Sequence, residues 1–173
     1  MTEKTVDLIE TKRLILRKFI PDDLHHLHRI ISSPEVCLYL FTEQPFSLRQ
    51  TEEWLLSMIQ NYQETDIEHM AIVERESGKL IGFGGLSLEE VDGDSFYEVG
   101  CVLEQESWGK GYAFESLSEV LHIAKNAYSL KEVIGIIKVG HVASVALCEK
   151  LGFTYWKISK YEGKDSKIYR KYM

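Results

Sequence analysis

A short glycine-rich segment at residues 107–113, Ser-Trp-Gly-Lys-Gly-Tyr-Ala, joins two runs of different hydrophobic periodicity. The run before it, 96–103, is rich in β-branched and aromatic residues, which is typical of a strand. The run after it, 113–128, repeats apolar residues at the spacing of one helix face. Glycines permit turns that other residues resist, and the unpaired N–H groups at a helix start attract anions. The segment therefore predicts a strand–loop–helix unit whose loop is either a phosphate-binding turn or a plain glycine-rich connection.

The same two periodicities organise the rest of the chain. Short turns join the three strands predicted within 70–103, which indicates an antiparallel meander. Gly82, Gly84 and Gly85 in its middle strand predict a bulge or a close backbone contact. The strand–helix–strand order over 96–138 predicts a right-handed crossover with local parallel pairing. Predicted strands cover 11–19, 70–74, 80–88, 96–103, 131–138, 153–158 and 167–172, and predicted helices cover 21–31, 47–62, 113–128 and 141–150.

These elements predict one α+β domain over residues 1–173. Its core is a mixed, mostly antiparallel central sheet of about seven strands, flanked by about four helices. We find no internal repeat, low-complexity segment or linker in the sequence, and we therefore expect no second domain.

Charge and cysteine content limit the possible partners. The formal net charge of −7 argues against general binding to nucleic acid or to an anionic membrane, since both favour a basic surface. Residues 1–7 contain no apolar signal core, and no run reaches membrane-spanning length. Cys37, Cys101 and Cys148 lack CxxC spacing, so we expect reduced, buried thiols. The sequence thus predicts a cytoplasmic protein that holds no metal ion.

Acidic residues are unevenly distributed. No Lys or Arg occurs in residues 80–109, which contain Glu89, Glu90, Asp92, Asp94, Glu98, Glu104 and Glu106. Such a run is commonly a solvated face. If it borders the site instead, it favours a cationic acceptor such as an amine.

Two familiar phosphate-binding motifs do not match the glycine-rich segment. A P-loop requires G-x-x-x-x-G-K-S/T, which none of the Gly-Lys pairs satisfies. A dinucleotide fingerprint requires a third glycine where Phe114 stands. The preceding strand is also reached through a meander rather than as the opening of a βαβ unit, so both alternatives are excluded.

Several ordered motifs resemble the GNAT N-acetyltransferase superfamily, and in particular its branch of ribosomal-protein-alanine N-acetyltransferases. Trp108 to Ala113, followed by Glu115, is similar to the family's acetyl-CoA pyrophosphate loop, whose general pattern is Gln/Arg-x-x-Gly-x-Gly/Ala. The other matching stretches are 10–17, 78–82, 97–100 and Ser144 with 149–153, so the resemblance spans nearly the whole chain.

The resemblance implies a function and a set of partners. It implies an N-acetyltransferase in which a primary amine, either a protein N-terminus or a small-molecule amine, attacks the thioester of acetyl-CoA directly. We expect no metal, no nucleic acid and no membrane partner, and either a monomer or a homodimer. The alternative is a GNAT-like module that binds or senses acyl-CoA but is catalytically impaired.

The resemblance also implies which residues bind the cofactor. The strand that ends before the loop is expected to pair with the pantetheine amides, and the loop N–H groups with the pyrophosphate. The predicted cofactor-binding residues are Cys101, Val102, Leu103, Trp108, Gly109, Lys110, Gly111, Tyr112, Ala113, His141 and Ser144. Three positions depart from the pattern: Trp108 replaces Gln or Arg, His141 replaces Asn, and Cys148 replaces the Tyr that protonates the departing thiolate in many members.

Acetyl transfer requires a neutral amine, and a lysine amine with a pKa of about 10.4 is mostly protonated at neutral pH. Glu98 is the predicted general base, because partial burial would raise its pKa toward the useful range. It is otherwise a surface carboxylate that orients backbone or substrate. Glu162 is a second, weaker candidate for the base.

Ser144 is predicted by resemblance to hydrogen-bond or protonate the leaving sulfur, or alternatively to cap the helix that starts near Gly140. We expect Cys148 to be a buried helix residue rather than a nucleophile. The aromatic connection at 37–46, with Tyr39, Phe41 and Phe46, either lines a pocket or packs in the core.

Overall fold

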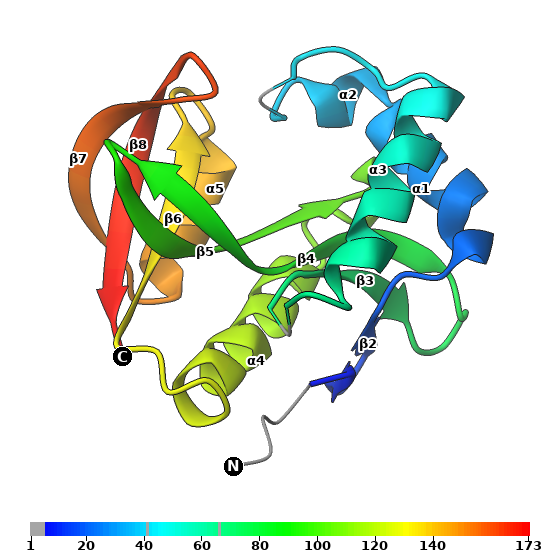
Figure 1. Ribbon diagram of the computed structural model, residues 1–173, viewed down its shortest axis with the longest axis horizontal. Helices are drawn as coiled ribbons and strands as arrows, with labels where there is room; N and C mark the ends of the chain where they lie inside the picture. The colour runs from blue at the N-terminus through cyan, green and yellow to red at the C-terminus, as the bar shows by residue number, and fades with distance from the viewer. Residues whose placement is uncertain (1–5, 41, 66) are drawn as a thin grey trace.

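The computed structural model describes residues 6–40, 42–65 and 67–173. Within them, eight strands form one sheet in the order β1-β2-β3-β4-β5-β6-β8-β7, with helices on both faces (Figure 1). All pairs are antiparallel except β5 with β6. The strands are β1 (Leu8–Glu10), β2 (Leu14–Arg17), β3 (His69–Glu74), β4 (Leu80–Val91), β5 (Asp94–Leu103), β6 (Glu132–Lys138), β7 (Thr154–Tyr161) and β8 (Lys164–Tyr172). The helices are α1 (Leu24–Ile31), α2 (Pro34–Cys37), α3 (Leu48–Asn61), α4 (Tyr112–Asn126) and α5 (Val142–Lys150), with two 3-10 turns at η1 (Pro21–Asp23) and η2 (Gln105–Ser107).

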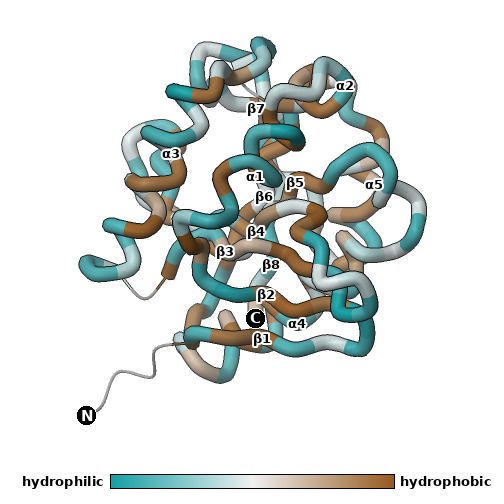
Figure 2. The backbone as a smooth tube through the Cα atoms, turned by 90° about the vertical axis from the view of Figure 1, so that its right-hand side faces the viewer, coloured by the Kyte–Doolittle hydropathy of each residue, from teal (hydrophilic) through white to brown (hydrophobic). Residues whose placement is uncertain are grey.

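The two faces of the sheet carry separate hydrophobic cores. Helix α4 packs its apolar side, including Leu117 and Leu121, against residues of β2 to β6. Helices α1 and α3 pack against the opposite face, where Phe83 of β4 meets Leu27 and Leu55. Hydrophobic residues accordingly recur along the central strands, and the outer loops are largely hydrophilic (Figure 2). Strands β3 and β4 are therefore covered on both sides.

The antiparallel meander and its glycine contacts are confirmed. Strands β3, β4 and β5 pair in sequence order, and β6 pairs with β5 in parallel after the α4 crossover. A Cβ atom on Gly82 would lie 2.2 Å from the carbonyl oxygen of Val102. One on Gly84 would lie 2.5 Å from the Cβ atom of Cys101. Both glycines therefore allow β4 to approach β5 closely, as their position in the strand predicts. A capping box forms at the start of α3, between Ser47 and Gln50.

The N-terminal strand is different from the one predicted over 11–19. The structure has two short strands, β1 and β2, because Thr11 forms a turn between them. Its hydroxyl accepts the N–H of Leu14 (2.9 Å), and its own N–H donates to the Leu14 carbonyl (2.9 Å). Strand β1 and the single-turn helix α2 were not predicted. Both are too short for periodicity to reveal.

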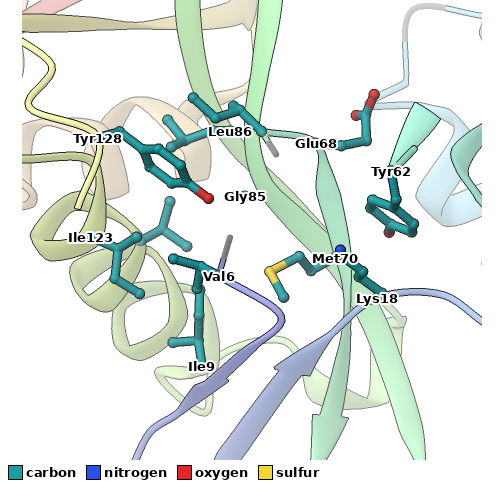
Figure 3. A pocket seen from close by; sticks show the side chains of 12 residues that line it. Val6, Ile9, Lys18, Tyr62, Glu68, Met70, Gly85, Leu86, Ile123 and Tyr128 are labelled. Carbon is teal, nitrogen blue, oxygen red and sulfur yellow. The ribbon is translucent and has the colours of Figure 1, made fainter. Parts of the chain in front are cut away.

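A small apolar cavity lies between the N-terminal strand, the start of β3 and helix α4 (Figure 3). Its lining includes Ile9, Met70, Leu86 and Ile123, and its volume is about 30 Å³. This is roughly the volume of one water molecule. The cavity is a packing void and does not fit a substrate.

Candidate active site

Strands β5 and β6 separate to form a deep cleft. They pair at one position, Glu98 opposite Ile134, and diverge toward Leu103 and Lys138. The cleft has a volume of about 640 Å³ and continues to the start of α4 and one side of α5. Diverging strands leave backbone N–H and C=O groups of both edges available to a ligand. An extended molecule that bears amide groups fits such a cleft.

The glycine-rich loop forms one end of the cleft. Gly109 and Gly111 adopt left-handed conformations, with φ of 72° and 80°, and Gly111 is the N-cap residue of α4. Within the described part of the chain, the Trp108 N–H donates to the Gln105 carbonyl (3.1 Å), and the next N–H recorded with a backbone carbonyl is that of Glu115, which donates to Gly111 (3.0 Å). The N–H groups from Gly109 to Phe114 therefore stand together at the positive end of a 15-residue helix. This arrangement suits an anion such as a pyrophosphate.

Arg13 holds the loop from the β1–β2 turn. Its guanidinium donates to Glu115 (2.7 Å) and to the carbonyl of Lys110 (2.9 Å), and it lies 4.4 Å from the centre of the Tyr112 ring. The other Glu115 oxygen accepts the hydroxyl of Thr11 (2.7 Å) and the N–H of Arg13 (2.7 Å). These contacts fix the first turn of α4 to the N-terminal strands. Sequence reasoning missed them, because they join residues about one hundred positions apart.

An aromatic cluster lies over the cleft beside the loop. Tyr39 stacks on His141 with ring centres 4.0 Å apart and meets Trp108 edge-on at 6.0 Å. The Trp108 indole donates to the carbonyl of Leu103 (2.9 Å). Burial, followed by the charge of Lys138, lowers the pKa of His141, so its ring is neutral at neutral pH. Tyr39 thus lines the cleft, whereas Phe46 packs in the α1–α3 core, and Phe41 lies outside the described residues.

Glu98 lies deeper in the cleft, where β5 and β6 meet. It is half-buried on the face of the sheet that carries α1 and α3, above Gly100. A Cβ atom on Gly100 would lie 2.8 Å from its Oε1 atom, so the glycine makes room for the carboxyl group. Burial, followed by the Glu89 carboxylate, raises the pKa of Glu98 to about 8. The N–H of Ile136 and the hydroxyl of Ser87 oppose this shift.

Helix α5 contributes the opposite wall. Its N-cap is His141, without a side-chain capping bond, so the capping role considered for Ser144 is not observed in the described structure. Ser144 is half-buried and lines the cleft. Burial, followed by Glu98, raises the pKa of Cys148 and of Cys101 to about 12, so both thiols are neutral. A Cβ atom on Gly135 would lie 3.0 Å from the sulfur of Cys148, which shows how closely α5 packs on β6.

The cleft brings most of the predicted site residues together. Lys110 is exposed and contributes its carbonyl to Arg13 rather than a surface to the cleft. Glu162 is exposed in the β7–β8 turn, away from the cleft lining. The predicted residues that line the cleft are Glu98, Cys101, Val102, Leu103, Trp108, Gly109, Gly111, Tyr112, Ala113, His141 and Ser144.

Four further residues at the Glu98 end were not predicted as site residues. They are His69, Ser87, Glu89 and Tyr161, of which all but Ser87 line the cleft. Glu89 accepts the hydroxyls of Ser87 (2.8 Å) and Tyr161 (2.6 Å). Only the acidic run on β4 indicated that a carboxylate might border the site, and it did not single out Glu89.

Two absences concern only the described residues. No helix among them is long and apolar enough to cross a membrane. No group of three or more His, Cys, Asp or Glu side chains among them is placed to hold a metal ion.

Comparisons with known proteins agree with this geometry. The family model described as acetyltransferase (GNAT) domain matches residues 13–154. An uncharacterized N-acetyltransferase of Bacillus subtilis (strain 168), YoaA, is 29% identical over 147 residues, which cover 84% of this chain and 82% of YoaA.

Solved structures show the same fold. The ribosomal-protein-S5-alanine acetyltransferase of Vibrio fischeri superposes with a TM-score of 0.73 at 16% identity, covering 95% of this chain and 96% of the other. The microcin C7 self-immunity acetyltransferase MccE, in complex with acetyl-CoA and AMP, superposes with a TM-score of 0.74 at 16% identity, covering 94% and 93%.

Proposed function

The chain belongs to the acetyltransferase (GNAT) family, and from this we propose that it transfers the acetyl group of acetyl-CoA to a primary amine by direct attack on the thioester. The acceptor is either a protein N-terminus or a small-molecule amine. The observation that carries the proposal is the single cleft between β5 and β6, which has an anion-binding loop at one end and a carboxyl group of raised pKa at the other.

The loop end fits the pyrophosphate of acetyl-CoA. Its N–H groups converge at the start of α4, and a Cβ atom on Gly109 would meet nothing within 4 Å, so the backbone is open to a ligand. The open edge of β5 offers the backbone groups of Cys101 to the pantetheine amides, whereas those of Val102 face Phe83 of β4. The Leu103 carbonyl is already bonded to the Trp108 indole, which leaves its N–H for this role.

His141 stands where the family commonly has Asn. A neutral imidazole has one N–H donor, so His141 can replace one amide hydrogen bond to the cofactor. Its stacking on Tyr39 fixes the plane of the ring. The substitution therefore supports a changed contact with the cofactor rather than a lost one.

Glu98 takes the proton of the acceptor amine in this proposal. Its pKa of about 8 lies between the pKa of an ordinary carboxyl group and that of a lysine amine. A base near the working pH combines a useful ionised fraction with a sufficient driving force for proton transfer. In its ionised form the carboxyl group also attracts an ammonium group into the cleft, which agrees with the acidic character of β4 and β5.

Ser144 is the proposed hydrogen-bond donor to the leaving sulfur. It lines the cleft from the first turn of α5, and its hydroxyl is not used as a helix cap in the described structure. The thiols of Cys101 and Cys148, with pKa values of about 12, are too weakly acidic to protonate a thiolate efficiently. Cys148 therefore does not take over the proton-donating role of the tyrosine that many family members have at this position.

The test of the proposal is release of free thiol from acetyl-CoA in the presence of single amines and N-terminal peptides. We expect acceptor-dependent thiol release and a higher melting temperature with CoA. Stabilisation by CoA without thiol release for any acceptor would instead support a binding or sensing module, the alternative that His141 and Cys148 suggest. A melting temperature unchanged by both CoA and acetyl-CoA would refute the cofactor assignment.

A further inference from the structure

A second cavity, of about 370 Å³, adjoins the cleft at its Glu98 end. The two cavities share His69 and Glu89 in their walls. The second cavity lies where β4 continues past the start of β3, so the edge of β4 is open there. Trp54 of α3 and the exposed Leu88 form part of its lining. Glu89 therefore stands between the reaction cleft and a space that reaches solvent.

Ser87 lies between Glu98 and Glu89. Ser87 of β4 lies directly opposite Glu98 of β5 in the antiparallel register, which places their side chains on one face. The Ser87 hydroxyl, which is buried, donates to one oxygen of Glu89 (2.8 Å). The same hydroxyl also lowers the pKa of Glu98, as a donor to the ionised carboxylate does. A hydroxyl has one proton, so while Ser87 donates to Glu89 it can only accept from Glu98, which must then be protonated.

The protonated form of Glu98 fixes the direction of the two hydrogen bonds. Burial and the Glu89 carboxylate favour the protonated form of Glu98, and a protonated carboxyl donates one hydrogen bond. The order is then the Glu98 hydroxyl to Ser87 Oγ, and the Ser87 hydroxyl to Glu89. Tyr161 of β7 donates to the second Glu89 oxygen (2.6 Å) and holds that carboxylate in place.

The other titratable groups around Glu98 are neutral. Burial raises the pKa values of Cys101 on β5 and Cys148 on α5, and that of Tyr161 on β7 as well. Burial lowers the pKa of His69 at the start of β3, although Glu68 and Glu89 oppose the shift. Among the described groups, Glu89 is the one whose charge is recorded as raising the pKa of Glu98.

We propose that Ser87 and Glu89 form a route by which a proton leaves the cleft. This proposal rests on the proposed function, in which Glu98 takes that proton from the acceptor amine. The Glu98 carboxyl gives its proton to Ser87 Oγ as the Ser87 hydroxyl gives its own to Glu89. The O–H bonds broken at Glu98 and Ser87 are replaced by O–H bonds formed at Ser87 and Glu89. Glu98 becomes a carboxylate again, and Glu89 becomes a carboxylic acid, which releases the proton to water in the second cavity. Ser87 and Glu89 relay the proton in this scheme and contact neither the acetyl group nor the acceptor amine.

The first test is the pH dependence of kcat/KM for a fixed amine in Glu89→Gln. Removing the Glu89 charge lowers the pKa of Glu98, so the acid limb moves to lower pH by about one unit. The matched control is Glu90→Gln, the adjacent and exposed carboxylate, which should keep the original limb. A Glu89→Gln profile that superposes on the parent profile overturns the proposal.

The second test separates the hydroxyl from the charge. Ser87→Ala keeps Glu89 and removes the connecting hydroxyl, so kcat should fall about tenfold and the solvent isotope effect on kcat should rise. The KM for the amine should change less than kcat. Ser87→Thr restores a hydroxyl and should recover kcat. Equal kcat and isotope effect in Ser87→Ala and the parent protein contradict the proton route.

A titration distinguishes failure of this proposal from failure of the proposed function. The carboxyl carbon of Glu98 is followed by NMR in the CoA-loaded chain, with assignment from Glu98→Gln. A lower Glu98 pKa in Glu89→Gln supports the coupling even if no amine is acetylated. An unchanged Glu98 pKa overturns it even if the chain is an active acetyltransferase.

Discussion

The two ends of the cleft bind by different physical means. At the loop end, the groups open to a ligand belong to the backbone, and the charged pair of Arg13 and Glu115 holds the loop from outside. At the Glu98 end, the groups that face the cleft are side chains, and the hydrogen-bond partners recorded for Glu98 and Glu89 are uncharged. In the proposed function, the first end therefore recognises a fixed anion, whereas the second keeps a proton available for exchange.

The largest effect on activity is expected from a substitution at the Glu98 end of the cleft. Glu98→Gln removes the base and should lower kcat/KM about 100-fold at pH 8, with loss of the acid limb. The melting-temperature increase caused by CoA should remain, because the loop end is intact. Asp94→Asn, an exposed change on the same strand, is the control. Retention of the acid limb in Glu98→Gln would assign the titration to another group.

The pH dependence of stability reports the titration of Glu98 without catalysis. Because the pKa of Glu98 rises from 4.5 to about 8 on folding, the folded state holds a proton that the unfolded state releases within that window. The contribution of Glu98 to stability therefore declines as pH rises from about 4.5 to 8. Glu98→Gln should gain melting temperature relative to the parent at high pH, and parallel melting curves across pH would contradict this.

The next largest effect, on CoA binding, is expected from a substitution at the loop end. Gly111→Ala forces a side chain into a left-handed conformation and should weaken CoA binding about tenfold, with a stability loss of about 1 kcal/mol. Gly78→Ala is the matched control, since Gly78 has a φ of 70° in the β3–β4 turn, with open space around its Cβ position. Calorimetric titration with CoA separates the two. Equal losses of affinity would mean that strain, rather than the cradle, determines binding.

A smaller effect tests the brace behind the loop. Arg13→Gln removes the contacts to Glu115 and the Lys110 carbonyl, so the KM for acetyl-CoA should rise about fivefold. The kcat with saturating acetyl-CoA should change little. Arg49→Gln, which removes an exposed ion pair with Glu53, provides the control. A fall in kcat at unchanged KM would mean that Arg13 acts at the Glu98 end of the cleft and would contradict this prediction.

The smallest effect concerns the leaving group. Ser144→Ala should lower kcat about threefold, because it removes one hydrogen bond to the sulfur in the proposed site. Ser57→Ala, in which an exposed hydroxyl bonded to the Trp54 carbonyl is lost, controls for the substitution itself. Steady-state kinetics with a good acceptor measure both. An unchanged kcat in Ser144→Ala would remove this residue from the reaction.

The two ends also differ in what the sequence revealed. The loop, Gly109 to Ala113, is contiguous, so glycine spacing predicted a strand–loop–helix unit, and the resemblance predicted a pyrophosphate as its ligand. Glu98 was also predicted, because its strand and the resemblance were both recognisable. The meander and the parallel β5–β6 pair followed from connection lengths.

The residues that were missed depend on tertiary contacts. Ser87 becomes relevant because the β4–β5 register sets it opposite Glu98, and Tyr161 because β7 brings it to Glu89. The Thr11 turn that replaces the predicted strand at 11–13 is stabilised in part by Glu115. No local pattern encodes these distances, and a shift of one residue in register would move each side chain to the other face.

Strands β5 and β6 pair at a single position. This divides the backbone hydrogen-bond network into two ladders, one of β1 to β5 and one of β6, β8 and β7. Each ladder can open without breaking the other, so amide hydrogen exchange should follow two cooperative units rather than one. A molecule that bonds to both strand edges joins the units. Exchange at 99–103 and 135–138 should then slow more on CoA binding than exchange in the outer strands does, so the bound molecule would complete the sheet as well as enter the reaction.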